Sequence, residues 1–485
     1  MSTSTAATAT RQHAAHDILV QIVARVANLA LGVVVTALLA RTLGSAGYGE
    51  WSTILVVLGL VGYLASFGME QAVVREVAAD PASEARWFGA MMYLRLTLLL
   101  PVLVGSVVAI VLLHSSHRML IAGLILTATM PFDGVSVMQL VFQLRLNNLV
   151  PMLVLTLRSV LWGAAVLIVY WTHSPGGGMI VLAIAMAGTN AIGSLVQTLA
   201  ALRVLGRFPR PSREHLRPLI KVGVPIGLSG VLIIAYARID QLIVFQVSGP
   251  RAAGLYGAVY GVLDQSHFVP ISVLTTLTPV IAASWPRNRE RMLRAVRQGA
   301  ELLAIASLGA LSFSIVAAGP VVRLVFGPQF ADAAPALPIL TATFVFICFG
   351  YLNGNLMAVL GLQRRMLRIG LWALLLNVAG NLLLVPPFGF IAAAWMTLAT
   401  ELLVCVLSTK QILARLELGL PAPGRILRSA IAAAVLAGAL ALMRTAGVPL
   451  GGLAAGACLL YPALLYALGA VEPGDLASVL RRRGG

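Results

Sequence analysis

The chain has 485 residues, of which 59% are hydrophobic and 11% are charged. Ordinary soluble domains have about 25% charged residues, so this composition excludes a water-soluble globular protein. The formal net charge of +17 does not indicate a nucleic-acid partner, because the arginines of a membrane protein report its topology instead.

The apolar residues form runs of about 20 or more, each long enough to cross roughly 30 Å of hydrocarbon as a helix. Only helices or closed barrels satisfy the backbone in lipid, and these continuous runs lack the alternation of barrel strands. We therefore predict an all-α membrane protein of about 14 transmembrane helices, with no removable signal peptide. The predicted spans are 18–40, 49–68, 88–112, 119–142, 149–171, 179–202, 219–247, 253–284, 298–322, 335–361, 366–386, 389–412, 425–444 and 447–470.

The basic residues are concentrated in every second connection between these spans, when the connections are numbered from the amino terminus. The two tails and the even connections hold 25 of the 34 Lys and Arg residues, the odd connections hold 5, and 4 lie inside spans. Because positive residues favour the cytoplasmic side, both termini are predicted to be cytoplasmic. A missed or additional helix would have disturbed this alternation downstream, so the charges also support the predicted number of spans.

Two internal matches divide the chain. LGSAGYGEWS at 43–52 matches RAAGLYGAVY at 251–260, and GGMIVLAIA at 177–185 matches FGFIAAAWM at 388–396. Each pair encloses six spans, so the two copies have the same orientation and are related by a pseudo-two-fold axis along the membrane normal. The predicted parts are a cytoplasmic tail at 1–17, a six-helix bundle at 18–205, a basic cytoplasmic linker at 206–218, a second six-helix bundle at 219–412, helices thirteen and fourteen at 425–470, and a basic cytoplasmic tail at 471–485.

The sequence gives no sign of an enzyme. It contains no P-loop, no dinucleotide fingerprint after a strand, no serine elbow and no zinc-ligand spacing. Its outward connections are too short for a catalytic domain, which argues against a membrane polymerase or ligase of sugars, the alternative from another functional class. Cys348, Cys405 and Cys458 lie far apart within apolar runs, so no disulfide framework is indicated.

Four arginines inside spans are the predicted binding residues for an anionic headgroup. A charge at mid-helix is disfavoured by roughly 2.5 to 3.5 kcal/mol, so such residues are functional candidates by default. Snorkelling to the inner interface is the alternative for the first two, and a structural ion pair between helices is the alternative for the other two. The four are Arg25, Arg95, Arg158 and Arg238.

Four carboxylates inside spans are predicted to bind a coupling proton or cation, and pairing with the buried arginines is their alternative role. They are Asp133, Asp240, Asp264 and Glu401. Arg238 and Asp240 are two residues apart and point to nearly opposite sides of a helix, so each needs a partner elsewhere. The nearby Tyr256 is interpreted as an interface anchor or a sugar contact, and Asn377 and Asn381 as donors of interhelical hydrogen bonds.

Several segments resemble a known family. ALLARTLGSAGYGEWS follows span one, SFGMEQAVVREVA follows span two, and YARIDQLIV lies in span seven. With LTPVIAASW, VFGPQFADAAPAL and VPPFGFIAAAWMT further along, they resemble the polysaccharide-export flippases of the multidrug, oligosaccharidyl-lipid and polysaccharide exporter superfamily. The resemblance covers most of the chain through span twelve.

This resemblance implies a transporter in the bacterial cytoplasmic (inner) membrane, working by alternating access. Its substrate would be a polyprenyl-diphosphate-linked oligosaccharide for O-antigen, capsule or exopolysaccharide, moved from the inner to the outer leaflet. A proton or sodium gradient is the expected energy source, no cofactor is expected, and membrane lipids and polysaccharide assembly proteins are the expected partners. A peptidoglycan lipid flippase and a cation-coupled multidrug exporter of the same superfamily remain the alternatives.

Overall fold

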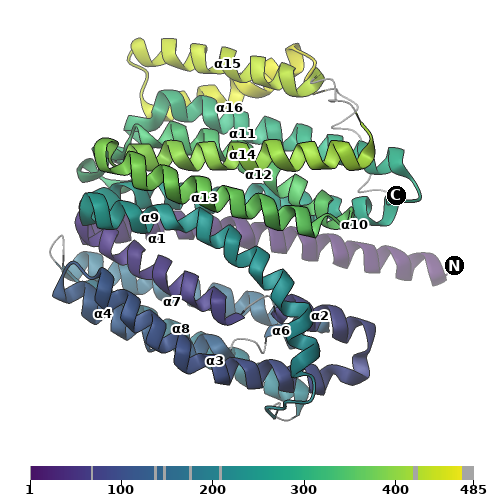
Figure 1. Cartoon of the computed structure of the whole chain (residues 1–485). Helices are drawn as coiled ribbons and strands as arrows, with labels where there is room; N and C mark the ends of the chain where they lie inside the picture. Colours follow the sequence, from purple (N-terminus) through teal and green to yellow (C-terminus); the bar gives the residue numbers. More distant parts are fainter. Residues whose placement is uncertain are drawn as a thin grey trace. The chain divides into compact units, whose positions relative to one another are not determined.

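A computed structural model gives the fold (Figure 1). It describes the backbone of residues 2–66, 69–135, 139–145, 149–173, 177–206, 210–418 and 424–471. Side chains are described in these ranges from residue 31 onward, except at residues 64–66, 71, 81, 133–135, 139, 143, 222, 225, 226 and 229.

All regular elements in these ranges are helical, which confirms the predicted all-α class. The α-helices are α1 Ser2–Ser66, α2 Met69–Ala79, α3 Glu84–Leu113, α4 His117–Thr127, α5 Met130–Val135, α6 Gln139–Leu144, α7 Leu149–Thr172, α8 Met179–Leu205, α9 Leu216–Ser266, α10 Phe268–Ser284, α11 Arg289–Phe326, α12 Ala336–Val359, α13 Gln363–Phe388, α14 Phe390–Leu416, α15 Gly424–Thr445 and α16 Leu450–Ala467. Two 3₁₀ turns, η1 Pro81–Ser83 and η3 Pro328–Ala333, lie between them.

Eleven helical stretches among the described residues are long and apolar enough to cross a membrane. The protein is therefore a multi-pass membrane protein. Two of these stretches, Leu31–Tyr63 and Gly230–Ser284, each contain parts of two predicted spans, and His117–Phe132 is a shorter apolar helix. The number of fourteen spans is consistent with this arrangement and stays a prediction.

The chain folds into two compact units. The first unit comprises Met1–Gly44 and Glu70–Leu219, and the second comprises Ser45–Met69 and Ile220–Gly485. The second half of α1 thus groups with the C-terminal part of the chain, whereas the predicted bundle at 18–205 includes it. The chain leaves the first unit at Gly44, where the backbone has a left-handed φ of 70°. The predicted division into two six-helix bundles is not tested by this grouping.

One predicted span is not a continuous helix. In the predicted span 119–142, the described residues belong to α4, α5 and α6 instead, with a break after Thr127. Pro131 has no backbone N–H to give to the preceding turn. The hydroxyl of Thr129 donates to the carbonyl oxygen of Leu126 at 2.7 Å. These local hydrogen-bonding requirements end the helix inside an apolar run, where hydropathy alone predicts continuity.

The internal repeat has a structural counterpart in the second unit. Gly249 has a φ of 82°, and the equivalent kink at Gly44 lies 205 residues earlier. The helices that follow the two kinks approach so closely that a Cβ on Gly254 would lie 1.7 Å from the Ser45 carbonyl oxygen, and one on Gly49 would lie 1.9 Å from that of Pro250. Ser45 and its counterpart Pro250, and Gly49 and its counterpart Gly254, are also 205 residues apart. The motifs matched in the sequence, which begin at residues 43 and 251, are 208 residues apart. The fold repeats the backbone crossing, whereas the sequence match aligned similar side chains.

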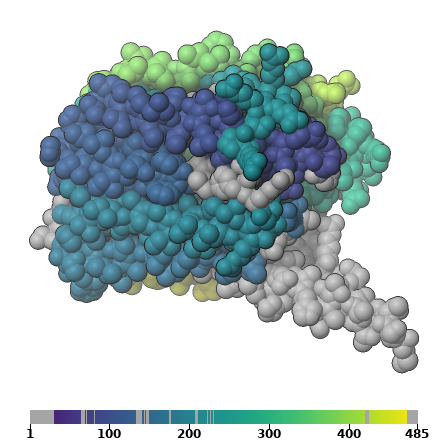
Figure 2. All heavy atoms as spheres, turned by 90° about the horizontal axis from the view of Figure 1, so that it is seen from below, coloured from purple at the N-terminus to yellow at the C-terminus, as the bar shows by residue number. Residues whose placement is uncertain are grey.

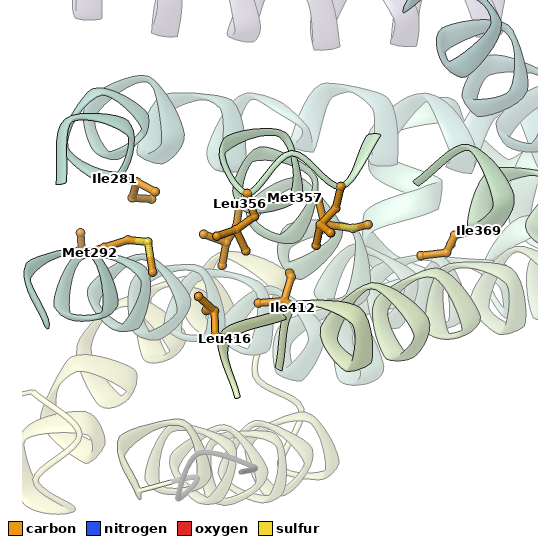
Figure 3. Packing of buried hydrophobic residues seen from close by; sticks show 10 residues of the cluster. Ile281, Met292, Leu356, Met357, Ile369, Ile412 and Leu416 are labelled. Atoms are coloured by element: carbon orange, nitrogen blue, oxygen red, sulfur yellow. The ribbon is translucent and has the colours of Figure 1, made fainter. Parts of the chain in front are cut away.

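One hydrophobic cluster of the second unit lies at one end of its helices (Figure 3). Ile281 lies in the last turn of α10, Met292 in the first turn of α11, and Ile412 and Leu416 near the end of α14, and all four are buried. The cluster includes Leu356 and neighbouring residues near the junction of α12 and α13. Helices in lipid associate through such close packing, because lipid tails are as apolar as the side chains. This packing holds α10 to α14 together at the end that carries the basic even connections.

The last two helices pack on α11 (Figure 1). The hydroxyl of Ser312 donates to the Ala433 carbonyl oxygen at 2.8 Å, and that of Tyr461 donates to the Ile305 carbonyl oxygen at 2.8 Å. Gly309 leaves room for the Tyr461 ring. Small residues on α11 thus allow α15 and α16 to approach closely, as at other transmembrane helix contacts.

Large apolar side chains point outward on the first unit. Leu100 and Leu112 on α3 are 68% and 76% exposed, and Leu195 on α8 is 59% exposed. Figure 2 shows the face of the molecule on which α3 lies, in blue. Such extensive apolar exposure is typical of a surface that contacts lipid.

Candidate functional site

The most deeply buried carboxylate in a span of the second unit belongs to Asp240 on α9, which is fully buried. Its Oδ2 accepts a hydrogen bond from the Tyr256 hydroxyl at 2.5 Å and from the Thr397 hydroxyl at 2.9 Å. Its Oδ1 accepts from the backbone N–H of Gln241 at 2.7 Å. Both oxygens are therefore hydrogen-bonded, as a buried ionisable group requires. This cluster joins both halves of the kinked α9 to α14.

Arg238, two residues earlier on α9, has a different set of partners. Its Nη2 donates to both carboxylate oxygens of Asp264, at 2.8 and 2.7 Å. Its guanidinium carbon lies 4.9 Å from the centre of the Tyr260 ring, as in a cation–π contact. Arg238 and Asp240 thus have separate partners, which confirms the prediction from their spacing. Arg238 therefore forms a structural ion pair between helical segments, which was the alternative to a role in binding an anionic headgroup.

The ion pair lies beside a break in the helix. α9 ends at Ser266 and α10 begins at Phe268, inside the predicted span 253–284. The His267 ring between them lies 5.7 Å from the ring of Tyr351 on α12. Its Nε2 is buried and has no hydrogen-bond partner among the described groups. Interrupted helices frequently form the ion and substrate sites of transporters.

Glu401 on α14 is one turn from Thr397 and is 9% exposed. A Cβ on Gly350 of α12 would lie 3.8 Å from its Oε2, so the carboxylate faces the α12 backbone. In the described part of the chain no ion pair involves Glu401. The predicted pairing of Glu401 with a buried arginine is therefore not observed there.

Amide side chains join the helices around these groups. Asn377 on α13 donates to the Thr400 hydroxyl of α14 at 3.4 Å, and Asn381 donates to the Asn377 side-chain oxygen at 3.0 Å. The predicted interhelical role is thus confirmed for Asn377. Asn381 Oδ1 is a buried acceptor with no partner among the described groups.

Two of the predicted cations are described in the first unit. Arg95 on α3 donates through Nη2 to Glu70 Oε1 on α2 at 2.6 Å, so it is paired with a carboxylate. Arg158 on α7 donates through Nη2 to the side-chain oxygen of Asn190 on α8. Arg25 lies on α1 and Asp133 on α5, but both side chains lie outside the described residues.

Sequence reasoning missed several partners of the predicted residues. Tyr256 was interpreted as an interface anchor or sugar contact, yet it is fully buried and donates to Asp240. Thr397 had a usable signal, because it lies four residues before Glu401 on the same helical face. Asn190 was a polar residue within an apolar span. His267 had no distinguishing pattern, because the helix break beside it is not visible in hydropathy.

The described residues contain no group of three or more His, Cys, Asp or Glu side chains suited to a metal ion. The buried polar groups instead form separate clusters of one or two charges with hydroxyls and amides. Such clusters suit a proton, a monovalent cation or an anionic ligand. Together with the multi-span helical fold, they are typical of a membrane transport protein.

The chain matches the family described as polysaccharide biosynthesis protein over residues 14–285. This segment is more than half of its 485 residues, and the chain belongs to this family. The match confirms the family resemblance that the sequence motifs indicated.

Two relatives share shorter segments. The uncharacterized membrane protein MJ1068 of Methanocaldococcus jannaschii is 27% identical over 188 residues, which cover 38% of this chain and 36% of that protein. The probable flippase AglR of Haloferax volcanii is 22% identical over 182 residues, which cover 37% of this chain and 38% of that protein. The matched segments span little more than a third of each relative.

Solved structures are similar over far more of the chain. The lipid II flippase MurJ in an inward closed conformation aligns with a TM-score of 0.75 at 12% identity, covering 92% of this chain and 98% of that one. An inward-facing multidrug resistance MATE family transporter of the MOP superfamily aligns with a TM-score of 0.60 at 15% identity, covering 81% and 99%. The chain therefore has the fold of these proteins. The similar proteins with named activities are flippases and transporters, not enzymes.

Proposed function

We propose that the protein is a flippase for a polyprenyl-diphosphate-linked oligosaccharide in surface polysaccharide biosynthesis. It moves this lipid from the inner to the outer leaflet of the cytoplasmic membrane by alternating access, with both of its own termini in the cytoplasm. Membership of the polysaccharide biosynthesis family and the MurJ-like and MATE-like fold support the proposal.

The observation that carries the proposal is the presence of arginines within apolar spans. Arg95, Arg158 and Arg238 all lie in helical stretches suited to crossing a membrane. A guanidinium in hydrocarbon is unfavourable unless an anion or water compensates it. Glu70 and Asp264 supply that anion to Arg95 and Arg238 in this structure. In the proposal a diphosphate headgroup supplies it to Arg158, whereas the polyprenyl tail of the lipid remains in the bilayer. Arg25 belongs to the same proposed set of substrate-binding residues.

The energy for transport comes, in this proposal, from a proton or sodium gradient acting on the buried carboxylates. Asp240 is the first choice, because its oxygens lie beside hydroxyls from two helices. A cation or proton that binds there changes the charge that α9 and α14 share. We expect Asp240→Asn to abolish the dependence of lipid export on the imposed gradient in membrane vesicles. Unchanged dependence would exclude Asp240 and leave Asp133, Asp264 and Glu401.

Deletion of the gene provides the direct test of the function. We expect the deletion strain to accumulate the lipid-linked oligosaccharide facing the cytoplasm and to lose the surface polymer. Extracted lipids and surface glycan are measured together, and the restored gene is the control. Intact surface glycan with altered drug sensitivity would indicate a multidrug exporter. Accumulation of the peptidoglycan lipid precursor would indicate a lipid II flippase.

A further inference from the structure

The three described span arginines differ in what compensates their charge. Arg95 is paired with Glu70, and Arg238 is paired with Asp264. Among the side chains that the structure describes, Arg158 has a neutral partner, the amide oxygen of Asn190, and forms no ion pair. An amide accepts one hydrogen bond without neutralising the guanidinium, whose five N–H donors can also hold an anion. The charge of Arg158 therefore remains available to an anionic ligand.

The position of Arg158 is determined by a glycine on the neighbouring helix. A Cβ on Gly193 of α8 would lie 2.3 Å from Arg158 Cδ and 2.6 Å from its Cγ. The backbone of Gly193 does not have a positive φ, so glycine is needed here because a larger side chain would collide with Arg158. The aliphatic part of Arg158 lies across this glycine, and Asn190, three residues earlier on the same face of α8, holds the guanidinium.

A second polar group lies next to this contact. Ser194 is 3% exposed, and its hydroxyl has no hydrogen-bond partner among the described groups. A buried hydroxyl without a partner is unfavourable, and a ligand with acceptor oxygens would satisfy it. Gln197 follows one turn later on α8 and is also buried. The α8 surface beside Arg158 thus combines hydrogen-bond donors with an apolar surround.

We propose that Arg158, positioned by Asn190 and Gly193, is the binding site for the diphosphate oxyanion of the lipid-linked substrate, and that Arg238 is a structural ion pair. This inference rests on the proposed flippase function and assigns the headgroup contact to one of its arginines. Arg158 touches the substrate, whereas Asn190 and Gly193 act through Arg158. Guanidinium binds phosphate oxygens in a bidentate manner, which gives orientation as well as attraction.

The sharpest test converts the neutral partner into a charged one. Asn190→Asp places a carboxylate where the amide oxygen accepts from Arg158. This carboxylate would neutralise Arg158 in an ion pair, as Asp264 neutralises Arg238. Asn190→Ala removes the amide but leaves the cation uncompensated. Asn355→Asp on α12 is the matched control, because it adds a carboxylate to a span of the second unit. Thermal unfolding of each purified variant shows whether it is folded.

Binding of a radiolabelled polyprenyl diphosphate to the purified full-length protein is the readout. We expect Asn190→Asp and Arg158→Ala to weaken binding by about tenfold or more, since each removes a charge-assisted contact. Gly193→Ala should weaken it too, by displacing Arg158, whereas Asn190→Ala should bind more tightly than Asn190→Asp. Asn355→Asp should bind within about twofold of wild type. Competition by inorganic pyrophosphate but not by phosphatidylglycerol would identify the diphosphate as the recognised group.

Wild-type affinity in folded Asn190→Asp and Arg158→Ala proteins would overturn the assignment, as would no binding by the wild-type protein. The deletion strain separates this failure from that of the function. Accumulated precursor together with unaltered binding would retain the flippase and place its headgroup site elsewhere. Loss of binding in the variants without precursor accumulation in the deletion strain would retain the anion site and reject the flippase.

Discussion

The carboxylates within the spans of the second unit have different surroundings although all three carry the same ionisable group. Asp240 accepts from two side-chain hydroxyls and one backbone N–H, whereas Asp264 is neutralised by Arg238. Glu401 faces the α12 backbone at Gly350. Hydrogen bonds from two hydroxyls and a backbone N–H do not neutralise the Asp240 carboxylate, so it can bind a proton or cation more readily than a carboxylate in an ion pair. This contrast distinguishes two predicted coupling residues that the sequence treats as equivalent.

The Asp240 cluster predicts a loss of stability on removal of one hydroxyl. Thr397→Val keeps the side-chain shape but removes a donor to a buried carboxylate, and we expect a loss of about 1–2 kcal/mol. Thr275→Val is the control, because the Thr275 hydroxyl is exposed and donates within its own helix to Ile271. Unfolding in detergent measures both variants. Equal effects would contradict a special role for the Asp240 contact.

At the scale of elements, the kinks in α1 and α9 determine how the helix segments that follow them pack, which the number of spans does not show. The segments that follow the Gly44 and Gly249 kinks meet at Gly49 and Gly254, where backbone lies against backbone. Such close crossings are possible only where no Cβ intervenes. The segment 45–69 belongs to the second unit through this kind of contact, although it is covalently continuous with the first half of α1.

This crossing predicts a strong effect of one added methyl group. Gly254→Ala would put a Cβ 1.7 Å from the Ser45 carbonyl oxygen, so the two helices must separate. We expect a loss of about 1–3 kcal/mol in the free energy of unfolding. Gly59→Ala is the matched control on the same segment, because a Cβ there meets nothing within 4 Å, and alanine favours helix by up to about 1 kcal/mol. A tolerated Gly254→Ala with unchanged stability would refute the close crossing.

At the scale of the whole molecule, the arrangement of charge predicts the topology. The even connections carry most of the arginines, including Arg364 at the start of α13, and the odd connections carry few. We expect a cysteine at position 364 to be protected from a membrane-impermeant maleimide in intact cells. A cysteine in place of Ala446, between α15 and α16, should react. The three native cysteines are replaced first, because Cys458 is exposed.

Permeabilised cells provide the control for this labelling, since both positions should then react. Reaction at position 364 and protection at position 446 in intact cells would reverse the proposed orientation. Reaction at both positions would show that the number of spans between them is wrong.

The sequence by itself determined that the chain lies in a lipid bilayer, that its fold is all-α, and which family it belongs to. Long apolar runs require a bilayer and helices whatever their tertiary contacts, and the motifs around the first repeat indicated the polysaccharide exporters. Hydropathy did not reveal the breaks after Thr127 and Ser266. Pro131 near the first break, and hydrogen bonds from the Thr129 and Ser266 hydroxyls to backbone carbonyl oxygens, change local hydrogen bonding with little change in hydrophobicity.

Only the tertiary structure decided which buried charges pair. Arg158 and Arg238 are equivalent in sequence, each an arginine within an apolar span. Arg238 lies beside a carboxylate 26 residues away, whereas Arg158 lies beside a neutral amide and a glycine. The neighbours of a charge on other helices depend on the rotation and register of packed helices, which the periodicity of one helix does not specify. For the same reason, Thr397 joins Asp240 across 157 residues of sequence.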